Sequence, residues 1–138
     1  MDGRRARTIS VSPAKLHVAT VIPVSDMARS RAFYEQTLGL AGEAVPGGHV
    51  LHAGDGARLY LLENAGYAGR AGWPLASFRA EDLPATVADL ARRGVTLEAM
   101  DDEPPWRTDE RGIADFGDTL IAWFRDPDGQ VLSVVQPV

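Results

Sequence analysis

The first half of the chain has the hydrophobic pattern of a strand followed by a helix. Residues 16–22 are apolar and rich in β-branched side chains, which predicts a strand. Ser25-Asp26 offers a helix cap, and the apolar positions after it recur at helical spacing until Gly39, a residue that suits the left-handed end of a helix. The predicted helical stripe consists of Met27, Tyr34 and Leu38, with Phe33 beside it.

Two more strands complete this half, and the second half repeats the order. Residues 49–53 and 57–63 predict two strands joined through Gly54-Asp55-Gly56, a sequence typical of a hairpin turn. Residues 75–80 predict the first strand of the repeat, and a helix follows a cap at Glu81-Asp82. The remaining predicted strands are residues 95–100, 119–125 and 130–136, the last two joined by Asp126-Pro127-Asp128-Gly129.

Matched spacing in the two halves indicates an internal duplication. Thirteen positions separate Asp26 from Gly39, and thirteen separate Glu81 from Gly94. Each half reads β-α-β-β-β, a unit whose helix covers one face of its sheet and leaves the other face uncovered. We therefore predict an α+β fold of two paired βαβββ modules, with mixed sheets curved around a central groove. An ordinary α+β sandwich without a groove is the alternative.

The boundaries of the domain follow from this pattern. A chain of 138 residues is long enough for one domain with a proper core and too short for two ordinary ones. We expect a single domain over residues 15–138, with modules at about 15–64 and 74–136. Residues 1–14 are predicted to be a mobile leader, and a strap that packs on a partner subunit is the alternative.

The composition excludes several classes of partner. Hydrophobic residues make up 45% of the chain and charged residues 24%, as in a globular protein. A formal net charge of −5 argues against nucleic acid as a partner, because phosphates demand a basic face. No apolar run is long enough to span a bilayer, so we expect no membrane partner. The chain has no cysteine, which excludes disulfides and thiolate chemistry and fits the cytoplasm, where we expect the protein.

Several motifs along the chain carry a resemblance to a known family. They are Val24-Ser25-Asp26, Phe33-Tyr34, Leu38-Gly39-Leu40, Leu90 to Gly94-Val95, and Ala122-Trp123-Phe124-Arg125-Asp126-Pro127-Asp128-Gly129. With these motifs the sequence resembles the vicinal-oxygen-chelate superfamily, which includes glyoxalase I, fosfomycin-resistance transferases, extradiol dioxygenases and bleomycin-resistance proteins. The resemblance implies the fold and a homodimer, but it does not fix the chemistry, because the superfamily includes isomerases, transferases, dioxygenases and plain binders.

The resemblance also implies four positions for metal ligands, two in each half. Metal-dependent members place His, Glu or Gln on the first and last strands of each half. Counted from the helix caps and the last turn, these positions hold Ala19, Tyr60, Leu75 and Ser133. Alanine and leucine cannot coordinate a divalent metal, and Tyr and Ser are poor substitutes, so we predict no metal and no other cofactor. His17, on the same face as Ala19, is interpreted as a buried or rim histidine rather than a ligand.

Alternation along the strands predicts which side chains line the groove. The predicted register places Leu51 opposite Tyr60 and His49 opposite Leu62 in the first hairpin. In the last hairpin it places Phe124 opposite Val131 and Ala122 opposite Ser133, and a shift by one residue would exchange Trp123 for Phe124. A filled core between the halves is the alternative to a pocket. The predicted ligand-binding residues are His17, His49, Tyr60, Trp73, Ser77, Arg79, Trp106, Trp123, Phe124 and Ser133.

Two irregular connections lie beside the predicted groove. The connection from Asp101 to Gly117 contains Pro104-Pro105 and Trp106, whose indole can stack on a flat ligand or pin the loop to the body. The glycine-rich connection from Gly66 to Trp73 is interpreted as the linker between the halves and as a second lip of the groove.

These features predict a protein that binds a largely apolar or aromatic small organic molecule without a metal. The analogy is with bleomycin-resistance proteins, which the resemblance implies bind drug in grooves at a dimer interface. The alternative is a metal-free lyase, isomerase or hydrolase that uses His17, His49, Tyr60 or Arg79. A glyoxalase-like enzyme with an unusual metal site and a protein with a ligand of another kind stay open, and the sequence identifies no catalytic residue.

Overall fold

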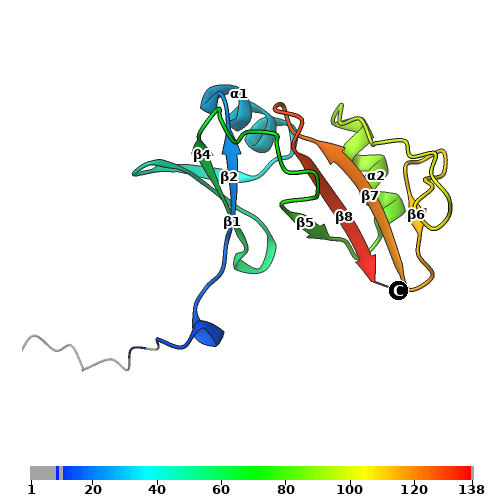
Figure 1. Ribbon diagram of the computed structural model, residues 1–138, viewed down its shortest axis with the longest axis horizontal. Coiled ribbons are helices and arrows are strands. Elements are labelled where there is room, and N and C mark those ends of the chain that lie inside the picture. The colour runs from blue at the N-terminus through cyan, green and yellow to red at the C-terminus, as the bar shows by residue number, and fades with distance from the viewer. Residues whose placement is uncertain (1–8, 10, 138) are drawn as a thin grey trace, which may run out of the picture.

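Two four-stranded sheets with the same topology make up the body of the protein (Figure 1). The structure is a computed structural model that describes residues 9 and 11–137. The strand order is β1-β4-β3-β2 in the first sheet, called sheet A, and β5-β8-β7-β6 in the second, called sheet B. In each sheet the first strand pairs in parallel with the last, and the other neighbours are antiparallel. This topology confirms the paired βαβββ units of an α+β fold.

Each sheet uses the residues of one half of the chain. Sheet A comprises β1 (Thr20–Val24), β2 (Ala41–Val45), β3 (Gly48–His52) and β4 (Arg58–Glu63), with the helix α1 (Met27–Arg31) and its π-helical continuation η2 (Ala32–Thr37). Sheet B comprises β5 (Ser77–Arg79), β6 (Ala114–Asp115), β7 (Thr119–Arg125) and β8 (Val131–Pro137), with the helix α2 (Leu83–Arg92). Two single 3₁₀ turns complete the elements, η1 (Pro13–Lys15) and η3 (Gly54–Gly56).

Both helices begin and end where the sequence predicts. The carboxylates of Asp26 and Asp82 each accept a hydrogen bond from the backbone N–H three residues later, at 3.1 Å. This satisfies a donor that the first helical turn cannot pair internally. Gly39 and Gly94 follow the helices with φ of 82° and 87°, a backbone conformation that glycine adopts without a steric penalty.

The first hairpin has a register one residue away from the predicted one. Tyr60 was expected opposite Leu51 and lies opposite Val50. The turn explains the difference, because the N–H of Ala53 donates to the carbonyl of Ala57 at 2.8 Å and so closes the hairpin around three residues. A shift of one residue moves every side chain of the partner strand to the other face of the sheet.

The last hairpin shows the same shift for the same reason. Ser133 was expected opposite Ala122 and lies opposite Trp123. Here the N–H of Asp126 donates to the carbonyl of Gln130 at 2.9 Å, again around a three-residue turn. Trp123 therefore lies on the groove side of β7, where the sequence pattern predicts Phe124.

The predicted strand at residues 95–100 is wrong. Within the described part of the chain, this segment makes only a single bridge to β7, between Leu97 and Phe124. β6 takes the edge position instead, where Ala114 pairs with Ile121. Pro104-Pro105 has no N–H to donate to a ladder, so the chain leaves the sheet as a loop before it returns. We call residues 101–113 the Trp106 loop.

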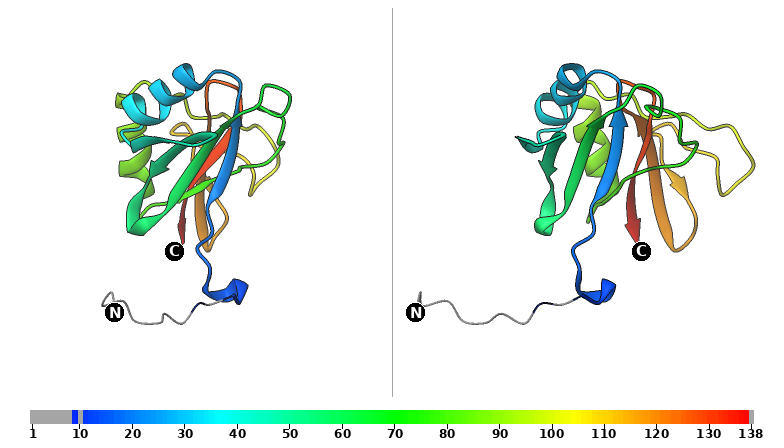
Figure 2. Two further views of the ribbon diagram at one scale, coloured as in Figure 1. Left: turned by 90° about the vertical axis from the view of Figure 1, so that its left-hand side faces the viewer. Right: turned by 60° about the vertical axis from the view of Figure 1, so that its left-hand side comes forward.

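One hydrophobic core joins the two halves. It includes Ile22 and Leu61 of sheet A, Phe124 and Val134 of sheet B, and Leu83 of α2, all less than 4% exposed. These side chains lie on the face of each sheet that carries the helices, which we call the helix-side face. The opposite face of each sheet, here called the open face, has no helix over it (Figure 2).

The segment before β1 extends away from both sheets (Figure 2). The described residues from Val11 to Val18 are exposed, and they include the large apolar side chains of Val11, Leu16 and Val18. Most of the predicted leader, residues 1–8 and Ser10, lies outside the described residues. None of the helices in the described part of the chain has the length and hydropathy needed to cross a bilayer.

Candidate functional site

A row of polar and aromatic side chains crosses the open face of sheet B. Ser77, Ser133 and Trp123 are direct partners on β5, β8 and β7. The hydroxyl of Ser133 donates to that of Ser77 at 2.9 Å. Ser133 and Trp123 are 3% and 5% exposed, whereas Ser77 is exposed. The row thus places a hydroxyl pair beside a buried indole.

Trp106 lies over this row and forms the outermost layer of an aromatic stack. Its indole stacks on that of Trp123 with ring centroids 6.2 Å apart and an interplanar angle of 28°. The ring of Phe116 meets Trp106 edge-on at 5.0 Å. Trp106 nevertheless remains 53% exposed. An indole supported from one side and exposed on another is a surface on which a flat ligand can stack.

Hydrogen bonds within the Trp106 loop hold this indole in place. The backbone N–H of Trp106 donates to the backbone carbonyl of Glu103 at 3.0 Å. At the base of the loop, the hydroxyl of Thr108 accepts from the N–H of Met100 at 2.8 Å, and the N–H of Thr108 donates to the carbonyl of Met100 at 3.1 Å. A loop held in this way loses little conformational entropy when a ligand binds.

The open face of sheet A has an apolar surface around one phenol. Val21, Tyr60 and Val50 form the central row on β1, β4 and β3. Val21 is 53% exposed, Tyr60 is half-buried and Val50 is buried. Leu62, two residues after Tyr60, is 43% exposed. Exposed apolar side chains grouped on one sheet face are typical of a surface that another molecule covers.

The structure places His49 on the helix-side face, so its expected position facing the groove is wrong. His49 lies opposite Leu61 instead of Leu62 and is only 2% exposed. Its Nε2 lies 2.9 Å from Oε1 of Glu35, and this nitrogen must donate because a carboxylate can only accept. The hydrogen bond from His49 lowers the pKa of Glu35 below its ordinary value. His49 is therefore a satisfied core histidine that fixes η2 on sheet A.

Phe124, His17 and Trp73 also lie away from the two open-face rows. Phe124 is 1% exposed and packs in the core against Phe78, a consequence of the shifted register. His17 is exposed before β1, because the register puts it level with Gly56, which precedes the start of β4 at Arg58. Trp73 is 66% exposed in the linker. The structure brings together four of the ten predicted residues on sheet B: Ser77, Trp106, Trp123 and Ser133.

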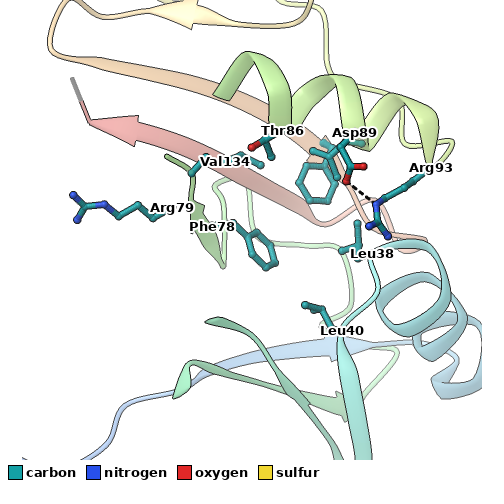
Figure 3. Close-up of a pocket in the computed structure, with 11 residues that line it drawn as sticks. Leu38, Leu40, Phe78, Arg79, Thr86, Asp89, Arg93 and Val134 are labelled. Atoms are coloured by element: carbon teal, nitrogen blue, oxygen red, sulfur yellow. Dashed lines mark hydrogen bonds and ion pairs between the residues drawn. The ribbon is translucent and has the colours of Figure 1, made fainter. Parts of the chain in front are cut away.

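A crevice of about 220 Å³ lies between the two halves on the helix side (Figure 3). Its apolar wall includes Leu38, Leu40, Phe78, Phe124 and Val134. The guanidinium of Arg93 lies at its rim, where Nε donates to Asp89 at 2.7 Å and Nη1 donates to the carbonyl of Thr37 at 3.2 Å. Arg93 and Asp89 therefore pair with each other at this rim, and the crevice is the seam along which the halves pack. Arg79 also lines the crevice.

A second cavity, of about 340 Å³, lies where the edge strand β5 meets the β3–β4 turn of sheet A. Arg79 and Ser77 line it from β5, and Arg58 and Thr20 line it from sheet A. Neither cavity is lined by Tyr60, so a groove closed by both open-face rows of one chain stays a prediction.

The four positions that metal-dependent relatives would use do not form a cation site. Ala19 lies ahead of β1, and Leu75 packs against the core ahead of β5. Tyr60 and Ser133 lie on the open faces of different sheets. No group of three His, Asp or Glu side chains within the described residues is arranged to hold a metal ion. The donor set at these positions does not fit a divalent metal.

Sequence reasoning missed a buried contact between the halves. The hydroxyl of Tyr34 on η2 donates at 2.8 Å to Asp126, which starts the last turn and is 5% exposed. Burial raises the pKa of Asp126, and burial together with the Asp126 carboxylate raises the pKa of Tyr34. Two residues on, Asp128 accepts hydrogen bonds from the hydroxyl of Ser25 and from Arg29, the latter at 2.9 Å. The Asp-Pro-Asp-Gly motif signalled a turn but not these partners.

Comparison with known proteins adds the family. The family model of the Glyoxalase/Bleomycin resistance protein/Dioxygenase superfamily matches residues 16–134. Among solved structures, the chain is similar to TnmS3, an antibiotic binding protein from Streptomyces sp. CB03234, with 25% identity and a TM-score of 0.60, over 90% of this chain and 98% of that one. No curated protein matches the chain.

Two other solved structures have a comparable likeness. A glyoxalase/bleomycin resistance protein from Catenulispora acidiphila DSM 44928 is 25% identical with a TM-score of 0.63, over 90% of this chain and all (100%) of that one. Another, from Streptomyces sp. CB03234, is 26% identical with a TM-score of 0.55, over 83% of this chain and 94% of that one. The similarity therefore extends over nearly the whole chain.

Proposed function

This chain belongs to the Glyoxalase/Bleomycin resistance protein/Dioxygenase superfamily, and from that premise we propose that it binds and sequesters an apolar or aromatic small molecule without a metal. The observation that carries the proposal is the stack on the open face of sheet B, where exposed Trp106 lies on buried Trp123. A flat ring system can extend this stack by one layer. The hydroxyls of Ser77 and Ser133 lie beside it as polar contacts.

The nature of the relatives supports a ligand of the antibiotic type. TnmS3 is an antibiotic binding protein with the same fold over nearly the whole chain. Side chains at the four positions of the metal-dependent relatives support a metal-free mode of binding, because Ala19 and Leu75 have no donor atom. Sequestration needs only shape and apolar contact, and the stack supplies both.

A homodimer is part of the proposal. Exposed Val21 and Leu62 leave an apolar surface on the open face of sheet A, and a second copy that covers it would supply one wall of the ligand site. Sedimentation velocity at micromolar concentration should give a mass of about twice 14.8 kDa. A monomer at all concentrations would contradict the homodimer, and the ligand site would then belong to a single chain.

Binding of a neutral flat probe tests the aromatic stack. We expect 9-anthracenemethanol to quench tryptophan fluorescence saturably, and Trp106→Ala to weaken its binding about tenfold, the loss of one aromatic stacking contact. Tyr67→Ala is the matched control, because Tyr67 is 69% exposed on the linker and should leave the affinity unchanged. Equal affinities of wild type and Trp106→Ala would contradict the stack as the binding surface.

Recovery of the probe separates binding from catalysis. After prolonged incubation with the protein, mass spectrometry should return 9-anthracenemethanol unaltered and in full yield. A converted product that forms in proportion to the protein would contradict sequestration and indicate a metal-free enzyme.

A further inference from the structure

Most arginine side chains in the described part of this acidic protein are paired with a carboxylate, and two of the three exceptions line one cavity. Ten arginines lie in the part of the chain that the structure describes. Seven of them have a carboxylate oxygen within 4.0 Å. The three that have no carboxylate partner among the described residues are Arg58, Arg70 and Arg79. Two of these three, Arg58 and Arg79, line the same cavity.

This cavity has the chemistry of an anion site. It has a volume of about 340 Å³, enough for a small organic group, and it lies at the junction of β4 and β5. Arg58 and Arg79 contribute two positive charges against the single carboxylate of Asp55. The hydroxyl of Ser77 accepts from Ser133 and keeps its own proton free to donate into the cavity.

The cavity continues the surface on which the proposed ligand lies. Arg79 follows Ser77 by two residues on β5, so both project from the same face of sheet B. Strand spacing puts the Cα atom of Arg79 about 12 Å from that of Trp123, two strands away and one row along. Figure 3 shows the Arg79 side chain extending away from Leu38 and Leu40, out of the crevice between the halves.

We propose that Arg58 and Arg79 bind a carboxylate of the ligand, which makes the natural ligand an aromatic carboxylic acid. The flat part lies on Trp106 while the acid group reaches the cavity, and a guanidinium fork matches the two carboxylate oxygens. This inference rests on the proposed function for the aromatic part of the ligand only. Arg58 comes from the first half of the chain and Arg79 from the second, so the anion site needs no second subunit.

A matched pair of probes tests the anion site. We expect 9-anthracenecarboxylate to bind wild-type protein at least tenfold more tightly than 9-anthracenemethanol, which lacks the charge. Arg58→Gln and Arg79→Gln should each reduce this preference by about fivefold to tenfold, as expected for the loss of one charge-assisted contact. Arg79→Lys, which keeps the charge but lacks the guanidinium fork, should retain more of the preference than Arg79→Gln does. Arg70→Gln is the control, because Arg70 also has no carboxylate partner among the described residues but does not line the cavity.

Arginine side-chain NMR locates the bound acid independently of affinity. The Nε–H signals of Arg58 and Arg79 should shift when 9-anthracenecarboxylate is added, and the Nε–H signal of Arg70 should not. Equal affinity for both probes in wild type would overturn the anion site and leave the proposed function intact. Binding of the acid alone, with shifts at both arginines but no effect of Trp106→Ala, would uphold the anion site and overturn the stack. If neither probe binds, both proposals are wrong.

Discussion

The central rows of the two open faces occupy equivalent positions and have opposite characters. In sheet A the row is Val21, Tyr60 and Val50, and in sheet B it is Ser77, Ser133 and Trp123. Val21 and Ser77 each lie five residues before a helix cap, so the rows correspond position by position. The row of sheet A has its single aromatic ring in the middle. The row of sheet B has hydroxyls in the middle and at one end, and an indole at the other end.

The rows differ further in what lies above them. In the first half β2 begins two residues after Gly39, so nothing is inserted between helix and sheet. In the second half a long segment separates α2 from β6 and contributes the Trp106 loop, whose indole stacks on Trp123. The comparison teaches that one duplicated scaffold can carry two surfaces, and that the insertion supplies the aromatic layer.

The largest expected effect on stability comes from replacing the buried side chain at the equivalent position of each row by alanine. Trp123→Ala should lower the free energy of unfolding by about 3–5 kcal/mol, because a buried indole under a stacked ring is lost. Val50→Ala, the equivalent change in sheet A, should cost only about 2 kcal/mol for its two buried methyl groups. Urea unfolding of both variants measures the difference. Equal losses would mean that the stack adds nothing to its row.

A smaller effect is expected from the contact that couples the halves. Tyr34→Phe keeps the ring in the core but removes the hydroxyl that donates to buried Asp126. The carboxylate retains hydrogen bonds from the backbone N–H groups of Asp128 and Gln130, so we expect a loss of about 1–3 kcal/mol. Differential scanning calorimetry should still show a single transition. Two separate transitions would show that this one hydroxyl is what makes the halves unfold together.

The smallest expected effect concerns pH and the first half alone. The pKa of Glu35 is lowered in the folded protein by the hydrogen bond from His49, so the pair stabilises the fold above the ordinary value of 4.5. That stability is lost as the pH falls below 4.5 through the folded pKa. Glu35 is partly exposed, and Glu35→Gln should therefore cost less than about 1 kcal/mol at pH 7.

Urea midpoints measured from pH 7 down to pH 3 check this dependence. The gap between wild type and Glu35→Gln should narrow as the acid is protonated. A gap that is constant over this range would assign the effect to packing of the side chain rather than to its charge.

Local chemistry explains why the fold was predictable. Asp26 and Asp82 cap their helices through their own side chains, and Gly39 and Gly94 end them through their own backbone freedom. Each of these signals acts within a few residues. The spacing from cap to glycine is thirteen positions in the first half and twelve in the second, and this near match exposes the duplication. The sequence could therefore predict the order of elements and the pairing of modules.

The strand register and the site were harder to predict from the sequence, because they depend on single hydrogen bonds and on partners that are distant along the chain. One turn bond at Ala53 decided that His49 faces the core and pairs with Glu35. The pattern did select Trp106 and Trp123, but only the fold shows that their rings stack. Alternation along the strand placed Arg58 on the same face as Tyr60, but the sequence could not single it out, because an arginine becomes notable only when its neighbours in space prove to lack a carboxylate.

The last turn acts as a clasp between the halves. The side chain of Asp126 is held by Tyr34, and that of Asp128 by Ser25. The linker lies close to this turn, because a side chain at Gly69 would collide with the backbone carbonyl of Asp128. A protease cut in the linker would leave this clasp intact. After such a cut, the two fragments should still elute together in size-exclusion chromatography, because the clasp and the shared core hold them to each other.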